Sequence, residues 1–266
     1  MEQLIRQFPL SFPTFQRGQV WLVGAGPGDP GLLSLLALHA LRSADVVIHD
    51  ALVDRRILTL AGADARLESA GKRGGRPSPS QPDISRRLVA LARQNLRVLR
   101  LKGGDPCVFG RGAEEACALA EAGVGFRVVP GITAGIGGLA YAGIPATARD
   151  ANSAIAFITG HDASGQVPDG LDWPALARSV PVLVVYMALT HLDEITLRLI
   201  RAGRPAQEPA ALICCATTPD QVVLTAPLAE IAALAAGRSL KPPAMLVVGR
   251  VVNYRATLNW LAGETP

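Results

Sequence analysis

The chain has 266 residues, 49% of them hydrophobic and 18% charged, with a formal net charge of +4. This composition excludes an extensively disordered protein, and no lysine- and arginine-rich block with interleaved aromatic residues indicates a nucleic-acid partner. The length allows one large domain or two of ordinary size, and the mildly basic balance suits a polyanionic ligand.

Two segments bear on targeting. Residues 1–18 lack the apolar stretch of a signal peptide, and we interpret them as a mobile N-terminal extension. The uncharged stretch VVPGITAGIGGLAYAGIPATA (128–148) is too rich in glycine and proline to partition well into lipid. It predicts a tightly packed internal helix, and we expect no membrane partner.

The chain contains four cysteines, which are Cys107, Cys117, Cys214 and Cys215. They form neither a CxxC motif nor a zinc-finger spacing with histidine, so we expect no metal site. Such cysteines are ordinarily reduced thiols in the cytoplasm, and we predict a cytoplasmic protein.

From residue 20 to about residue 147, strand patterns alternate with helix patterns. The expected strands are VWLVGAG, DVVIHD, ARLESAG, RVLRLKGG and FRVVPG, and the expected helices are LLSLLALHALRSA, ISRRLVALARQN and RGAEEACALAEAG. This alternation implies an α/β domain whose sheet is parallel or mostly parallel and covered on both faces. The segment KRGGRPSPSQP (72–82) is rich in glycine, proline and serine, and it predicts a mobile surface loop.

The alternation resumes after a junction at GIPATARDAN (143–152). The expected strands there are SAIAFITGH, PVLVVYMAL, PAALICCAT and AMLVVGRVV, and the clearest helices are LDEITLRLIRAG and LAEIAALAAG. We therefore predict two α/β domains. The predicted ranges are an extension (1–18), an N-terminal domain (19–148), a C-terminal domain (149–256) and a tail (257–266).

The first glycine loop departs from a dinucleotide-binding fingerprint. Gly24 and Gly26 fit the G-x-G-x-x-G pattern, but Asp29 stands where the third glycine is needed. Pro27 and Pro30 also remove amide donors that a pyrophosphate would use. The loop is better suited to pressing its backbone against a ligand that carries no phosphate.

Two further loops follow strands of the same half, LKGGDP (101–106) and VVPGIT (128–133). Ligands of open α/β sheets bind beyond the carboxyl ends of the strands. Each loop taken alone favours an ordinary turn between a strand and a helix. Three of them, with FGRGAEE (109–115) nearby, predict one backbone-lined pocket.

Long segments of the chain resemble a known family. They are VGAGPGDPGLLSLLALHALRSADVVIHDALV, GKR, RLKGGDPCVFGRGAEE, VVPGITAGIGGLAYAGIPATARD and YM. In this order and spacing, from about Val20 to Val252, they closely resemble the uroporphyrinogen-III C-methyltransferases of the tetrapyrrole methylase superfamily.

The resemblance implies the tetrapyrrole methylase fold, in which S-adenosylmethionine binds in a cleft between two α/β domains. The implied cosubstrate-binding positions are Pro27, Gly103, Gly104, Asp105, Val108, Thr133, Ala134, Met187 and Ala216. Small residues of this kind let backbone groups approach a ligand. Asp105 could favour a cationic ligand or cap the turn before Pro106, and both roles can hold together.

The reaction implied by the resemblance is the transfer of two methyl groups to C2 and C7 of uroporphyrinogen III. The product, precorrin-2, is shared by the pathways to sirohaem, cobalamin and haem d1. Asp50 falls on the family's proposed proton acceptor and Lys72 on its proposed proton donor. From the residues alone, Asp50 reads as a helix cap and Lys72 as a solvated loop charge.

The substrate is an octa-acid macrocycle, so its binding requires cations. By resemblance, Arg111, Glu114 and Arg149 lie near this substrate. Arginine can bind carboxylates with two hydrogen bonds, and Glu114 could orient Arg111 from three residues along one helix face. The alternative for Arg111 and Glu114 is an ion pair on the surface with no role in binding. A homodimer is also expected from the family.

Several positions depart from the family pattern. His49, Ala148, Ala188 and Ala216 stand where tyrosine, histidine and two glycines are common, and Gly135 replaces a common alanine. We expect the methyl group of Ala216 to point toward the ligand and narrow its pocket. These changes keep two alternatives open, which are a methylase acting at another ring position and a non-catalytic tetrapyrrole-binding protein.

Overall fold

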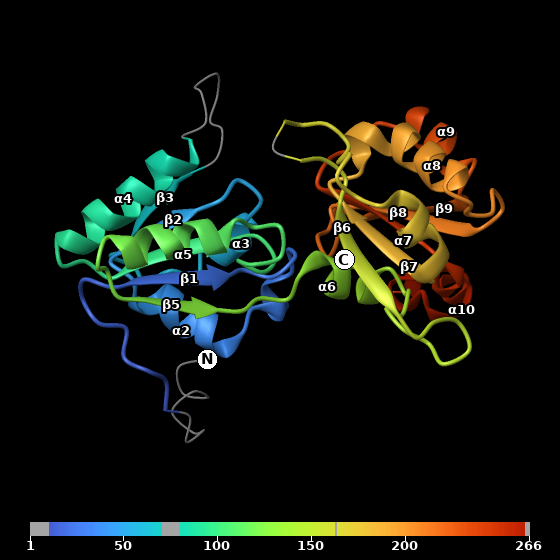
Figure 1. The fold of residues 1–266 in the computed structure, drawn as a ribbon. Coiled ribbons are helices and arrows are strands. Elements are labelled where there is room, and N and C mark those ends of the chain that lie inside the picture. The colour runs from blue at the N-terminus through green and yellow to red at the C-terminus, as the bar shows by residue number, and fades with distance from the viewer. Residues whose placement is uncertain (1–10, 71–79, 163, 264–266) are drawn as a thin grey trace. The chain divides into compact units, whose positions relative to one another are not determined.

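The computed structural model describes residues 11–70, 80–162 and 164–263, and the chain divides after Ile132 into two units. Each unit holds a five-stranded sheet with helices (Figure 1), which confirms the α/β class. The domain boundary predicted at 148/149 lies further along the chain than the division after Ile132 in the structure. Helix α6 (Ala134–Tyr141) falls in unit 2 because its Leu139 is buried against Val182 and Val184 of the second sheet.

The sheet of unit 1 has the order β3-β2-β4-β1-β5, and each pair of neighbouring strands in it is parallel, as predicted. Its strands are β1 (Val20–Gly24), β2 (Val46–His49), β3 (Arg66–Ser69), β4 (Val98–Lys102) and β5 (Phe126–Val129). Its helices are η1 (Pro30–Leu32), α2 (Leu35–Ser43), α3 (Arg55–Leu58), α4 (Gln81–Arg93) and α5 (Gly112–Glu121).

Both faces of this sheet are buried because side chains alternate along each strand. In β1, Val20 and Leu22 pack in the cluster that contains α4 and α5, whereas Trp21 and Val23 pack in the cluster that contains α2 and α3. Helix α4 begins with a capping box in which Ser80 and Asp83 exchange hydrogen bonds, so residues 81 and 82 are helical rather than part of the predicted loop.

Residues 11–18 are packed against unit 1, so the prediction of a mobile extension is wrong for this part. Phe12 stacks on His39 with ring centroids 5.0 Å apart, and Phe15 stacks on Trp21 at 4.5 Å. Only 4% of Phe15 is exposed. Aromatic residues in a short terminal segment supply enough apolar area to dock it on a sheet.

Unit 2 begins with α6 and contains a mixed sheet of order β6-β7-β10-β8-β9. Its strands are β6 (Ile155–Thr159), β7 (Val182–Tyr186), β8 (Pro209–Cys214), β9 (Val222–Pro227) and β10 (Ala244–Val248). Its other helices are α7 (Trp173–Ser179), η2 (Leu189–His191), α8 (Leu192–Arg201), α9 (Ile231–Ala236), η3 (Arg250–Tyr254), α10 (Arg255–Leu258) and η4 (Trp260–Gly263).

Only β6 and β7 pair in parallel among the described strands of this sheet, whereas β7–β10, β10–β8 and β8–β9 are antiparallel. The edge strand β9 is not among the strands expected from the sequence, and Leu224 is its only buried residue. Helices α7, α8 and α9 cover one face, and α6 with η3 covers the other.

The stretch considered above as a membrane span forms β5 and α6, which confirms the predicted internal helix. Within the ranges that the structure describes, no helix combines the length and hydropathy needed to cross a bilayer. The predicted tail is partly packed, since Trp260 meets Tyr141 edge to face at 5.2 Å and donates to the Ala140 carbonyl at 3.0 Å.

Replacing Phe15 tests the packed N-terminal segment. We expect Phe15→Ala to lower the free energy of unfolding by about 2–4 kcal/mol, because it removes a buried aromatic ring from the Trp21 face. Urea unfolding followed by circular dichroism measures the change. Phe126→Ala is the matched control, since that ring is 41% exposed. Equal losses in the two variants would contradict the packing described for residues 11–18.

Candidate functional site

The strands of unit 1 end together at one edge of the sheet. Val23 of β1 pairs with Leu101 of β4 and Val129 of β5, and Leu101 also pairs with His49 of β2. The residues that follow these strands therefore share one edge, as expected for parallel strands. Asp50 and the three glycine loops all lie there.

Four glycines bring the loops into direct backbone contact. Gly26 and Gly104 exchange hydrogen bonds, with N–O distances of 3.1 and 2.8 Å. A Cβ atom on Gly24 would lie 2.5 Å from both the Gly104 oxygen and the Gly131 nitrogen. No side chain fits at this contact, so the three loops meet through their backbones. The ligand pocket expected from them stays a prediction.

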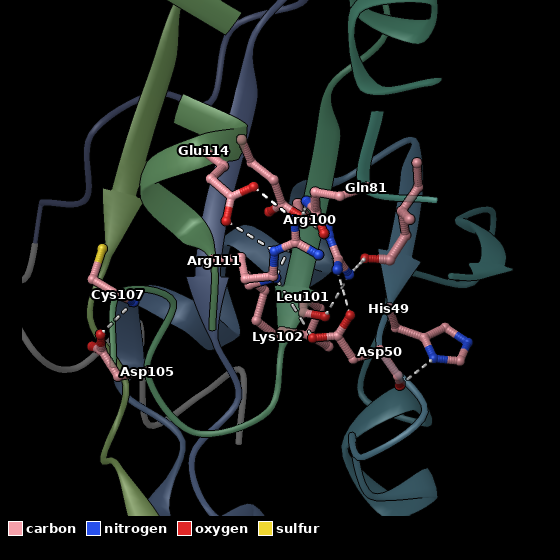
Figure 2. A network of polar contacts seen from close by, with 12 residues as sticks. His49, Asp50, Gln81, Arg100, Leu101, Lys102, Asp105, Cys107, Arg111 and Glu114 are labelled. Carbon is pink, nitrogen blue, oxygen red and sulfur yellow. Dashed lines mark hydrogen bonds and ion pairs between the residues drawn. The ribbon is translucent and has the colours of Figure 1, made fainter. Parts of the chain in front are cut away.

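Asp105 joins two of these loops through its carboxylate. One oxygen accepts from the Cys107 backbone N–H at 2.8 Å, and the other accepts from the Gly131 N–H at 3.0 Å. Figure 2 shows the first of these bonds. The first bond is the turn-capping interaction considered from the sequence, and the second fixes the 128–133 loop against the 101–106 loop.

The remaining predicted positions of unit 1 lie in the same loops. Pro27 and Val108 are half-buried, and Gly103 faces Leu52, whose Cβ would be 3.3 Å from an added Cβ. The turn after Pro27 is held by Asp29, whose side chain accepts from the Gly31 N–H at 2.7 Å.

Asp50 lies at the exposed end of a charged cluster that the sequence analysis did not anticipate (Figure 2). Its carboxylate accepts from Arg100, and its second oxygen is 3.7 Å from the Lys102 Nζ atom. Arg100 and Lys102 alternate with apolar residues in β4, and both contact Glu115 of α5. Two cations on one face of a strand buried on both sides are a sequence signal for a buried acidic partner.

Arg111 and Glu114 form a two-point ion pair, with distances of 2.9 Å from Nε and 2.7 Å from the terminal nitrogen. The pair lowers the pKa of Glu114 and raises that of Arg111 through their side-chain hydrogen bonds. Arg111 does not lie on the helix face as expected. It precedes α5 with a left-handed backbone (φ 58°), and both side chains are exposed.

In unit 2 the predicted positions gather at one end of the second sheet. Met245 of β10 pairs with Tyr186, and the adjacent Ala244 pairs with Cys214. Met187 and Ala216 therefore follow β7 and β8, which end on either side of β10 at the same end of the sheet. The Tyr186 hydroxyl is 2.7 Å from the Thr133 hydroxyl, and it accepts from the Gly135 N–H at 2.6 Å, which brings Thr133 and Ala134 to the same end.

The methyl group of Ala216 does not point as expected. It belongs to the buried cluster with Leu139 and Met245, and it packs on Gly138 of α6. A Cβ on Gly138 would lie 2.8 Å from the Ala216 Cβ. The small residue in α6 therefore accommodates the methyl in the core.

Two other departures are also buried. Ala188 is fully buried in the core of unit 2. His49 is 8% exposed, and its Nδ1 atom is 3.0 Å from the Asp50 carbonyl oxygen, so Nδ1 carries the proton when this hydrogen bond forms.

Two of the predicted site residues, Arg149 and Lys72, are not placed in contact with the other predicted site residues. Arg149 is exposed in the turn before Asp150 of unit 2, and Lys72 lies outside the described residues. Among residues 11–70, 80–162 and 164–263, no group of three or more histidine, cysteine, aspartate or glutamate side chains could hold a metal ion.

Comparison with known proteins identifies the class to which this fold and site belong. Residues 19–232 match the family model of the tetrapyrrole (corrin/porphyrin) methylases. The chain is 60% identical over 249 residues to a uroporphyrinogen-III C-methyltransferase of Sinorhizobium, covering 94% of this chain and 89% of that protein. The chain therefore belongs to the tetrapyrrole methylases.

Further relatives are longer. A siroheme synthase of Sodalis glossinidius is 49% identical over 93% of this chain, and the match covers 52% of that protein. The chain thus spans about half the length of the siroheme synthases that it matches.

Solved structures agree with the fold. The uroporphyrin-III C-methyltransferase of Thermus thermophilus, solved with S-adenyl homocysteine, is 40% identical and superposes with a TM-score of 0.77 over 88% of this chain and 99% of its own. A cobalt precorrin-4 methyltransferase, at 22% identity, matches with a TM-score of 0.79 over 90% and 98% of the two chains and shows the shared fold alone.

A pair of substitutions tests the packing of Ala216. We expect Gly138→Ala to lower the free energy of unfolding by about 1–3 kcal/mol, because its Cβ meets the Ala216 methyl and the end of Met245. Adding Ala216→Gly should recover part of this loss, and urea unfolding measures the coupling. Gly170→Ala is the control, since nothing lies within 4 Å of its added Cβ. Strictly additive effects would contradict the contact.

Proposed function

We propose that this chain transfers methyl groups from S-adenosylmethionine to C2 and C7 of uroporphyrinogen III and forms precorrin-2. The proposal is supported by the 60% identity to a uroporphyrinogen-III C-methyltransferase over nearly the whole of both chains. The observation that carries it is the shared edge of unit 1, where the glycine loops, Asp50 and the Arg111–Glu114 pair follow neighbouring strands.

The loops have the composition that an adenosyl sulfonium requires. Gly24, Gly104 and Gly131 leave only backbone at the contact, and both oxygens of Asp105 already receive backbone N–H groups. A ligand there meets amides and carbonyls rather than a phosphate-binding set of cations. The positions assigned to the cosubstrate are Pro27, Gly103, Gly104, Asp105 and Val108 in unit 1, and Thr133, Ala134, Met187 and Ala216 in unit 2.

Methyl transfer requires little chemistry from the protein. The ring carbon attacks the methyl carbon, the carbon–sulfur bond breaks, and S-adenosylhomocysteine leaves with the bonding electron pair. Because the sulfonium is already activated, the main task is to hold the two carbons in line. The macrocycle must then lose one proton for each methyl group gained, so a base assists.

Asp50 is the proposed base. It is the one member of its charged cluster with a substantially exposed side chain, at 31%, and it lies at the edge shared with the glycine loops. Lys72 keeps its proposed role as proton donor, as a prediction from the sequence.

Arg111, Glu114 and Arg149 are proposed to bind the carboxylates of the macrocycle. Arg111 is exposed, and Glu114 occupies its Nε and one terminal nitrogen. Glu114 thus fixes the plane of the guanidinium, and the remaining N–H groups of Arg111 can donate to a substrate carboxylate.

A product assay tests the proposal. Uroporphyrinogen III incubated with the protein and S-adenosylmethionine should gain two methyl groups, as measured by mass spectrometry and by NMR assignment of C2 and C7. Methylation at another ring position would replace the proposal by a different methylase activity. Tight macrocycle binding without any methyl transfer would indicate a non-catalytic protein.

The assignment of Arg111 gives a binding prediction. Arg111→Ala should weaken macrocycle binding by about tenfold to a hundredfold, as expected for one charge-assisted contact, while the affinity for S-adenosylhomocysteine stays within about twofold. Calorimetric titration measures both affinities. Arg93→Ala, which removes an exposed cation from α4, is the matched control. Equal losses of both ligands would contradict the division between Arg111 and the glycine loops.

The assignment of Asp50 gives a kinetic prediction. Asp50→Asn should lower kcat by about 10²–10⁴, because the amide cannot accept the proton that leaves the macrocycle. The control is Asp64→Asn, at an exposed position of the same unit. An unchanged kcat in Asp50→Asn would show that Asp50 has a structural role and is not the base.

Two expectations from the sequence accompany this proposal. The protein is proposed to act as a homodimer and to work in the cytoplasm, and both stay predictions. Light scattering of the eluted protein would give twice the mass of 27.8 kDa for the dimer.

A further inference from the structure

A charge-balanced cluster lies behind Asp50 and is not used by the mechanism above. Arg100 and Lys102 are 2% and 3% exposed at the side chain, and Glu115 is fully buried, whereas Asp50 is 31% exposed. Two cations therefore face two carboxylates, and only one of the four groups reaches solvent to a substantial degree.

Glu115 anchors both cations from the helix side. Its Oε1 atom lies 3.0 Å from Arg100 Nε and 3.3 Å from Lys102 Nζ, and it accepts from Gln81 Nε2 of α4 at 2.8 Å. Three donors thus meet one buried oxygen. Glu115 of α5 therefore holds both cations of β4, and Gln81 of α4 holds the Glu115 carboxylate.

The Arg100 guanidinium is also held by the backbone. One terminal nitrogen donates to the carbonyls of Ile48 and Leu101 at 3.3 Å each, which leaves the other directed at Asp50 (Figure 2). The Asp50 backbone N–H donates to the same Leu101 carbonyl at 3.1 Å. Both the main chain and the carboxylate of Asp50 are therefore tied to β4.

Burying these charges is costly. Burial lowers the pKa of Lys102, and the neighbouring charge of Arg100 lowers it further. Apolar side chains of similar volume commonly stabilise a core at least as well as a buried ion pair. A role outside stability therefore accounts better for two cations in a central strand.

We propose, resting on the function proposed above, that Arg100 and Lys102 are positioning residues which hold the Asp50 carboxylate oriented to accept the proton released by the methylated macrocycle. The cluster carries two positive and two negative charges before this step. After the carbon–carbon bond to the methyl has formed, the ring loses a proton, which protonates Asp50 and passes to solvent from the exposed side of this carboxylate.

The other charged groups around Asp50 are consistent with this role. His49 contacts the Asp50 backbone carbonyl, and not its carboxylate, in the described geometry. Glu114 has a pKa lowered chiefly by Arg111 and slightly by Lys102, and Arg111 has a pKa raised chiefly by Glu114 and slightly by Glu115.

Lys102→Met tests the proposal, because methionine keeps the length of the side chain and Arg100 still pairs with Glu115. We expect kcat to fall by about tenfold to a hundredfold, with the KM for both substrates within about threefold of the original. Lys102→Arg should recover part of the rate. Arg93→Met serves as the charge-matched control and should leave kcat unchanged.

The decisive measurement combines this change with Asp50→Asn. A residue that acts through Asp50 has little further effect once the carboxylate is gone, so the double variant should match Asp50→Asn within about twofold. An equal loss of kcat from Lys102→Met in both backgrounds overturns the proposal, as does an unchanged kcat in the single variant.

If Lys102→Met does not fold, as judged by circular dichroism, Lys102→Met with Glu115→Gln carries the same test, since it removes one charge of each sign from the buried cluster. A protein that forms no methylated product before any substitution contradicts the proposed function. A protein that is active and insensitive to these changes contradicts the positioning role alone.

Discussion

Backbone contact between Gly24, Gly104 and Gly131 is the constraint on which the first unit depends. These residues end or follow three neighbouring strands, and a side chain at any of them would push the loops apart. Because the loops touch, Asp105 can bridge two of them with one carboxylate. The edge of the sheet is thereby fixed without a metal ligand or a disulfide among the described residues.

The same edge separates two kinds of environment. Around the glycine loops the available groups are amides and carbonyls, whereas β4 and α5 carry a dense arrangement of charges centred on Glu115. The neutral part suits the methyl donor and the charged part suits proton handling. Parallel strands ending at one edge place the two side by side with no additional element.

Much of this arrangement could be predicted from the sequence. The strands of unit 1, its parallel sheet and the meeting of the loops follow from apolar runs that end in glycine. The antiparallel pairing in unit 2 could not be predicted, because helix-like and strand-like segments alternate in its sequence in the same way as in unit 1. The family was identified from long motifs such as RLKGGDPCVFGRGAEE, which carry far more information than a glycine spacing.

The misjudged details of Ala216 and of the two cations in β4 share a physical cause, which is that a packing partner on another element decides them. Ala216 was expected to face a ligand, but Gly138 provides room for its methyl in the core. Arg100 and Lys102 are visible in the sequence as charges in a strand, but their partner Glu115 lies on a helix face that reads as ordinary surface. Arg111 forms the predicted pair from outside the helix, which its left-handed backbone permits.

The ring stack at the start of the chain has a practical consequence for anyone shortening it. Trp21 is 1% exposed because Phe15 covers one side of it, and the guanidinium of Arg127 lies 5.1 Å from the centroid of its ring. A truncation placed just before β1 would remove Phe15 and expose one face of the Trp21 indole to water. Within the described residues, the packed part of unit 1 therefore begins at Phe12, ahead of β1.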